Sequence, residues 1–149
     1  MNKGERIQAY VNSLKTGSLR NPYYESYFIC FNEQKYYEAH DVLEHLWLEE
    51  RGAAHQFFKG LIQFAGAFVH LQKQYLRPEH ITDGRRLYPA WRLFKLARVN
   101  LEPFFPNFLD LEVRSVLELC SKNVQALESS DFKKNPWSPD AAPKLGLRS

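Results

Sequence analysis

The sequence of 149 residues has few cysteines, no long hydrophobic run and no large excess of charge of one sign. Its two cysteines, Cys30 and Cys120, are far apart and form no C-x-x-C motif, so neither a zinc knuckle nor a thioredoxin-like motif is predicted. We expect both to be reduced thiols packed inside the protein. Twenty Lys and Arg against 17 Asp and Glu give a net charge of +3, and nucleic acid is therefore not an expected partner.

No segment has the composition of a membrane span. The most apolar stretch, residues 60–71, contains Gln63 and His70 and is far shorter than the roughly 20 residues that a spanning helix needs. The first residues lack the apolar stretch of a secretory signal, so a cytoplasmic protein is expected. The sequence also has no Walker loop, no G-x-S-x-G and no G-x-G-x-x-G, so nucleotide-binding and serine-hydrolase functions lack their usual motifs.

The sequence does contain repeated apolar positions at helical spacing. No run alternates strictly between apolar and polar residues, so no strand is predicted. The expected fold is all-α: a single-domain bundle of about five helices over residues 1–132, then an extended Pro-rich tail over residues 133–149 that Trp137 pins to the bundle. The helices are expected at about residues 7–14, 33–50, 54–75, 83–102 and 111–127. Asn32 is expected to cap the second of these, after a short aromatic segment.

Two of the expected helices carry polar residues beside their apolar faces. At 100° per residue, His40 and Glu44 lie one turn apart at the edge of the apolar arc of helix 33–50. In helix 54–75, Gln63 and His70 share a narrow stripe with Gly66, whose small size lets another helix approach closely. If helix 33–50 packs on this stripe, the four polar side chains meet.

Two interpretations of these residues stay open. The first is a buried polar network that fixes helix register and shapes a groove for a partner, because an unpaired buried polar group costs about 1–3 kcal/mol. The second is a hydrolase-like enzyme that depends on a divalent metal or a small molecule, with His40 and Glu44 as catalytic candidates and with His40, Glu44 and His70 as candidate metal ligands. The candidate binding residues are Glu38, His40, Asp41, Glu44, Trp47, Gln63 and His70.

The basic residues of helix 83–102 and the aromatic content of the chain do not point to one specific function. Arg85, Arg92 and Lys95 share one sector of helix 83–102 and are more typical of a solvated face than of an RNA or phosphate site. The 22 aromatic residues fit either a filled core or a dimer interface, so the composition allows a homo-oligomer.

The segment from Phe31 to Trp47, FNEQKYYEAHDVLEHLW, and the segment KGLIQFAGAFVH at residues 59–70 together resemble the family catalogued as domain of unknown function 309. The resemblance extends weakly through Gly84, Leu87 and residues 101–103. It implies a small all-α bundle and no assigned activity. Two positions depart from the family pattern, since Gln34 stands where a glycine is expected and Asp41 where a glutamate is usual.

Overall fold

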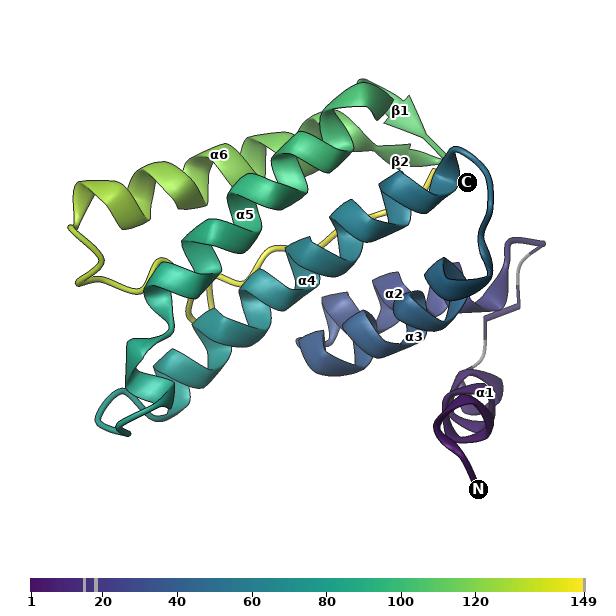
Figure 1. Ribbon diagram of the computed structural model, residues 1–149, viewed down its shortest axis with the longest axis horizontal. Helices are drawn as coiled ribbons and strands as arrows, with labels where there is room; N and C mark the ends of the chain where they lie inside the picture. The colour runs from purple at the N-terminus through teal and green to yellow at the C-terminus, as the bar shows by residue number, and fades with distance from the viewer. Residues whose placement is uncertain (15, 18, 149) are drawn as a thin grey trace.

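Six α-helices and one short hairpin form the part of the chain that the computed structural model describes, residues 1–14, 16–17 and 19–148 (Figure 1). The helices are α1 (Lys3–Ser13), α2 (Pro22–Asn32), α3 (Tyr36–Glu49), α4 (Ala54–Leu76), α5 (Leu87–Leu101) and α6 (Val113–Ser129). Two 3-10 turns, η1 (Asp83–Arg85) and η2 (Glu102–Phe104), flank α5. The all-α prediction is confirmed. No helix of the described residues is long and apolar enough to cross a membrane.

Helix α2 is the one that the sequence analysis did not predict. Its start carries ordinary signals, because the Asn21 side chain accepts the backbone N–H groups of Tyr23 and Tyr24, and Pro22 occupies the first turn. Its interior gives no amphipathic pattern, because it is buried on most sides. The buried residues are Tyr24, Ser26, Tyr27, Phe28, Cys30 and Phe31. Asn32 ends this helix instead of capping the next, and α3 begins without a side-chain cap.

The hairpin is a second departure from the prediction, which contained no strand. Strands β1 (Asn107–Phe108) and β2 (Leu111–Glu112) pair antiparallel. Leu109 and Asp110 connect them with φ values of 45° and 64°, the left-handed backbone that a two-residue type I′ turn requires at both positions. Since such turns usually carry Asn-Gly or Asp-Gly, the residues Leu-Asp gave no signal.

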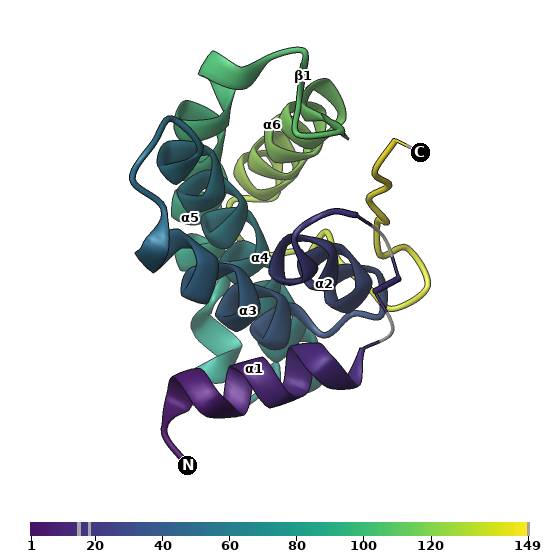
Figure 2. The same cartoon turned by 90° about the vertical axis from the view of Figure 1, so that its right-hand side faces the viewer.

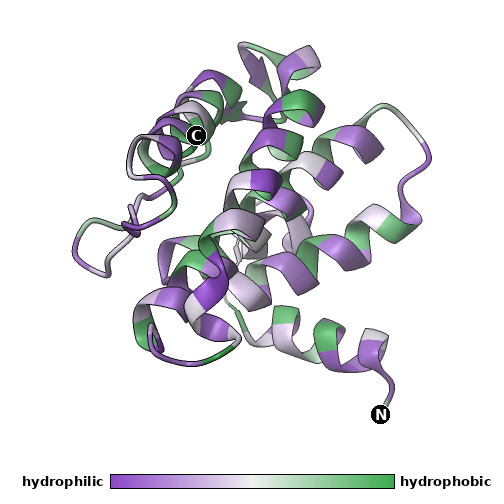
Figure 3. Cartoon of the chain, turned by 60° about the vertical axis from the view of Figure 1, so that its left-hand side comes forward, coloured by the Kyte–Doolittle hydropathy of each residue, from purple (hydrophilic) through white to green (hydrophobic). Residues whose placement is uncertain are grey.

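Aromatic rings from four helices fill the core. Phe31 lies 5.2 Å from Phe68, and Phe68 lies 5.3 Å from Phe94, ring centre to ring centre. Hydrophobic and hydrophilic residues alternate along most of the helices in Figure 3, as expected where a helix buries one face. Helix α4 lies at the centre and packs against both α3 and α5, whereas α1 lies beside α2 and α3 (Figure 2).

The glycines of α4 face α5, and not the helix that the sequence analysis expected there. A Cβ at Gly60 would lie 2.6 Å from Cγ of Leu101, and one at Gly66 would lie 3.2 Å from Cδ1 of Leu93. Both leucines belong to α5. Helix α3 packs on a neighbouring face of α4, so the polar residues of α3 approach the Gln63–His70 stripe from the side.

After α6 the chain runs back along the bundle to the hairpin, where Leu147 pairs with Leu111 (Figure 1). Trp137 is buried, and its indole N–H donates to the Tyr36 hydroxyl over 3.0 Å. The Asn32 side chain donates to the carbonyl oxygen of Leu145 and accepts its backbone N–H, both at 2.7 Å. The boundary at residue 132 between bundle and tail stays a prediction.

Candidate functional site

A groove of about 250 Å³ lies between α3, α4 and α5, and we call it the His70 groove. Its apolar lining consists of Ile62, Gly66, Val69 and Leu93. Its polar lining consists of Tyr37, His40, Gln63 and His70. Three of the four polar residues singled out from the sequence therefore line one groove, and the fourth, Glu44, does not. The three side chains are partly exposed. In the part of the chain described, no hydrogen bond joins His40 on α3 to Gln63 or His70 on α4.

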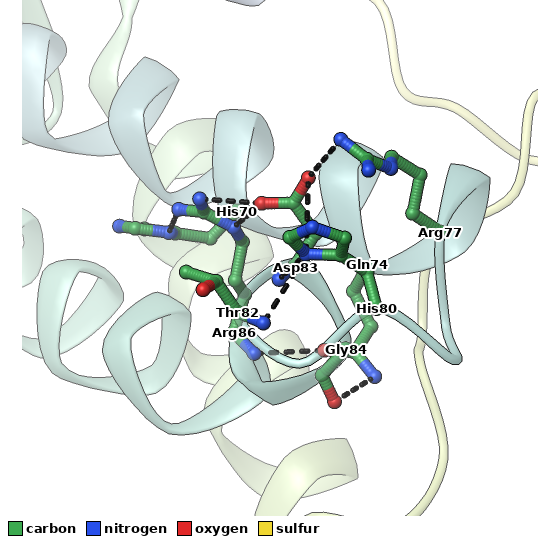
Figure 4. A network of polar contacts seen from close by, with 8 residues as sticks. All are labelled: His70, Gln74, Arg77, His80, Thr82, Asp83, Gly84 and Arg86. Carbon is green, nitrogen blue, oxygen red and sulfur yellow. Dashed lines mark hydrogen bonds and ion pairs between the residues drawn. The ribbon is translucent and has the colours of Figure 1, made fainter.

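His70 is held by a polar network that comes from the turn between α4 and α5 (Figure 4). Nη1 of Arg86 lies 3.2 Å from Nδ1 of His70. The same guanidinium binds Oδ1 of Asp83 through Nε at 2.8 Å and Nη2 at 2.6 Å. Asp83 also binds Arg77, and its backbone N–H donates to Nδ1 of His80. The hydrogen bonds from Arg86 are the main reason that the pKa of Asp83 is lowered.

This network fixes the chemical form of His70. Burial, followed by the charges of Arg86 and Lys73, lowers its pKa to about 4, so the ring is neutral at physiological pH. A guanidinium has only donors, so Nδ1 must accept from Arg86 and the ring hydrogen is placed on Nε2. Among the described residues Nε2 has no hydrogen-bond partner. His70 is therefore a neutral N–H donor in the groove, and its single lone pair is taken.

Gln63 is oriented in the same way. Its carbonyl oxygen Oε1 accepts a hydrogen bond of 2.8 Å from Nδ2 of Asn100 on α5. Within the described part of the chain its amide Nε2 has no partner, so this N–H₂ group is a second donor. Seven residues separate Gln63 from His70, which corresponds to roughly 10 Å along the helix. The two donors thus lie toward opposite ends of an apolar floor.

His40 and Glu44 have partners on their own helix and on α1. Nδ1 of His40 lies 3.3 Å from Oδ1 of Asp41, and Nε2 lies 3.8 Å from Oε2 of Glu44. Glu44 also binds Nζ of Lys3 at 3.3 Å, and the side chains of His40 and Glu44 are 31% and 29% exposed. They are therefore part of a half-exposed charged cluster rather than of a buried network shared with Gln63 and His70.

The remaining candidates lie outside the His70 groove. Glu38 and Asp41 line a separate groove of about 440 Å³ between α1 and α3, where Lys3 pairs with Asp41 at 3.9 Å. Trp47 stacks on His55 with ring centres 4.8 Å apart. Its buried indole N–H has no hydrogen-bond partner among the described residues. Of the seven predicted binding residues, three thus line the His70 groove, two line the second groove and one forms the stacked pair, whereas Glu44 lines neither groove.

The candidate metal ligands do not come together as a set. In residues 1–14, 16–17 and 19–148, no group of three or more His, Cys, Asp or Glu side chains is placed to hold a metal ion. The lone pair of His70 faces Arg86, which is itself a cation. The arrangement instead offers hydrogen-bond donors above an apolar floor, a combination found in sites for small organic molecules.

Sequence reasoning missed Arg86, Asp83 and Leu93 as parts of the site. A helix was expected from about residue 83, whereas in the structure α5 begins at Leu87 and Asp83 binds two arginines ahead of it. The spacing of Asp83 and Arg86 is that of a local ion pair and could have indicated this contact. The contact from Arg86 to His70 spans 16 residues and two elements, so no local pattern encodes it.

Comparison with known proteins gives one match. The model of the family described as "Domain of unknown function (DUF309)" matches residues 24–79, and this confirms the resemblance seen in the sequence. The match begins at Tyr24 within α2, includes α3 and α4, and ends before Gly84, so the weak extension through residues 84–103 lies outside it. Searches of curated proteins and of solved structures gave no significant match.

Proposed function

We propose, from the geometry of the groove, that the protein binds a small organic molecule in the His70 groove. The family whose model matches residues 24–79 has a name that states no activity. The observation that carries the proposal is the contact from Arg86 to Nδ1 of His70. It leaves a neutral N–H donor, fixed in one tautomer, in a groove with an apolar floor. Binding sites typically combine such a floor with a few oriented polar groups.

The chemistry of the lining limits what the ligand is. Ile62, Val69 and Leu93 favour an apolar body, because covering them with apolar atoms removes hydrophobic surface from water. His70 and Gln63 each offer an N–H group, so the ligand carries an acceptor such as a carbonyl or carboxylate oxygen. The open volume of about 250 Å³ suits a small molecule rather than a folded partner.

A ligand-observed NMR screen tests this proposal with small apolar molecules that carry carbonyl, amide or carboxylate groups. In the variant Leu93→Trp a larger side chain fills the groove, whereas Leu96→Trp places the same residue on an exposed position of the same helix. We expect ligands that bind the wild type and Leu96→Trp but not Leu93→Trp, with all three proteins folded by thermal melting. Wild-type protein that binds nothing in the screen, or ligands that bind all three proteins alike, would overturn the proposal.

A hydrolase-like enzyme is the second candidate, and the contacts of His40 support it. A carboxylate beside one ring nitrogen orients a histidine that acts as a base through the other, and Asp41 lies in such a position. Two observations weigh against it: the other ring nitrogen faces Glu44, and Lys3 pairs with that carboxylate. Activity toward chromogenic esters that is lost in His40→Ala and kept in His45→Ala would favour the enzyme.

A further inference from the structure

The end of the groove at His70 carries an excess of positive charge. Arg86 lies against His70, Lys73 lies one turn further along α4, and Arg77 binds the far side of Asp83. Among the described residues, the carboxylate that pairs with these arginines is that of Asp83, which the two share. Asp41 and Glu44 lie beside His40, and Lys3 pairs with both of them. At the His70 end the charges of Arg86, Arg77 and Lys73 thus exceed that of Asp83, whereas the carboxylates beside His40 are paired with Lys3.

This charge acts on any ligand group that reaches His70. The field of Arg86 and Lys73 disfavours a proton on the imidazole, which is why it contributes to the low pKa of His70. The same field stabilises a negative charge placed against Nε2. A hydrogen bond from an N–H group to a carboxylate is also about twice as strong as one to a neutral oxygen. The neutral N–H donor of His70, close to Arg86 and Lys73, therefore binds an anionic acceptor more strongly than a neutral one.

We infer that the ligand of the His70 groove is a small organic carboxylate with an elongated apolar body. Its carboxylate accepts the Nε2 hydrogen of His70, and its body lies over Gly66, Val69 and Leu93 toward Gln63. The roughly 10 Å between the two donors along α4 leaves room for a chain rather than for a compact acid such as acetate. This inference depends on the proposed function, since it names the ligand class of the same groove.

Octanoate and octanamide test the inference, because they share one chain and differ in charge. We expect the full-length protein to bind octanoate at least about tenfold more tightly than octanamide in calorimetry at low salt, and acetate more weakly than either. Raising the ionic strength reduces the preference for octanoate, because exposed Lys73 is screened. Lys73→Gln is expected to lower the affinity for octanoate and to leave the affinity for octanamide unchanged. Lys59→Gln is the control and is expected to change neither affinity, because Lys59 lies roughly 20 Å from Lys73 along α4.

The outcomes separate the two proposals. Equal binding of octanoate and octanamide, blocked by Leu93→Trp, would overturn the carboxylate and keep the groove as a ligand site. A preference for octanoate that survives both His70→Leu and Lys73→Gln would place the anion elsewhere and overturn the inference. If neither probe binds and the wider screen is also negative, the proposed function fails together with the inference.

Discussion

Replacing Arg86 with glutamine is expected to raise the pKa of His70. Arg86 lies 3.2 Å from Nδ1, and its charge is the second cause, after burial, of a pKa lowered from 6.5 to about 4. Glutamine removes the charge and leaves the burial, so the pKa of the variant should lie between these two values. Arg77→Gln is the matched control, because Arg77 binds the same Asp83 but does not contact His70.

The low pKa also makes stability depend on pH. Between pH 6.5 and about 4 the unfolded chain takes up a proton at His70 and the folded chain does not, so the unfolding free energy falls as the pH falls through this range. The full difference between the pKa values of His70 in the unfolded and folded chains corresponds to a change of roughly 3 kcal/mol in the unfolding free energy. Since the side chain is partly exposed, solvent screening reduces the expected contribution to about 2 kcal/mol. Below pH 4 both states are protonated and the contribution is constant.

Two measurements check this reasoning. The Hε1 and Cε1 signals of the five histidines, followed by NMR from pH 3.5 to 8, give the midpoint of His70, which His70→Gln assigns. Long-range ¹H–¹⁵N spectra at pH 7 report which ring nitrogen carries the hydrogen, and we expect Nε2. A midpoint near 6.5 in the wild type, or a hydrogen on Nδ1, would refute the assignment of His70 as a neutral donor held by Arg86.

Three substitutions test the framework around the site by urea unfolding. Gly84→Ala places a Cβ 2.2 Å from the carbonyl oxygen of Pro78, a backbone atom that cannot move aside, so we expect a loss of about 2–3 kcal/mol; wild-type stability would contradict the packing of this turn. Asn32→Ala removes both hydrogen bonds to Leu145 and should cost about 2 kcal/mol, and an unchanged midpoint would mean that the tail does not depend on them. Gln34 has a φ of 62°, and glycine adopts this left-handed backbone at roughly 1 kcal/mol lower cost. Gln34→Gly also loses the hydrogen bond from the Gln34 side chain to the carbonyl oxygen of Pro139, so we expect stability within about 0.5 kcal/mol of wild type. A larger loss of stability would show that this hydrogen bond outweighs the backbone strain.

The sequence by itself determined the helical class and most of the helices. Apolar residues at helical spacing mark α1, α3, α4, α5 and α6, because amphipathic helices carry their burial pattern locally. It also pointed to His40, Gln63 and His70, since polar residues beside an apolar arc are visible without any knowledge of the partner. The departure at Gln34 was visible too, and the structure forms the turn there with left-handed backbone despite the missing glycine.

Only the tertiary structure decided what these residues do. Helix α2 is buried on most sides and so shows no polar face, which hides it from periodicity. Three sets of contacts join residues that are far apart in the chain: those of Gly60 and Gly66 with α5, that of Arg86 with His70, and those of Asn32 with Leu145. Such contacts depend on how whole helices pack, and a local sequence pattern specifies only which face of a helix is buried, not which neighbour covers it.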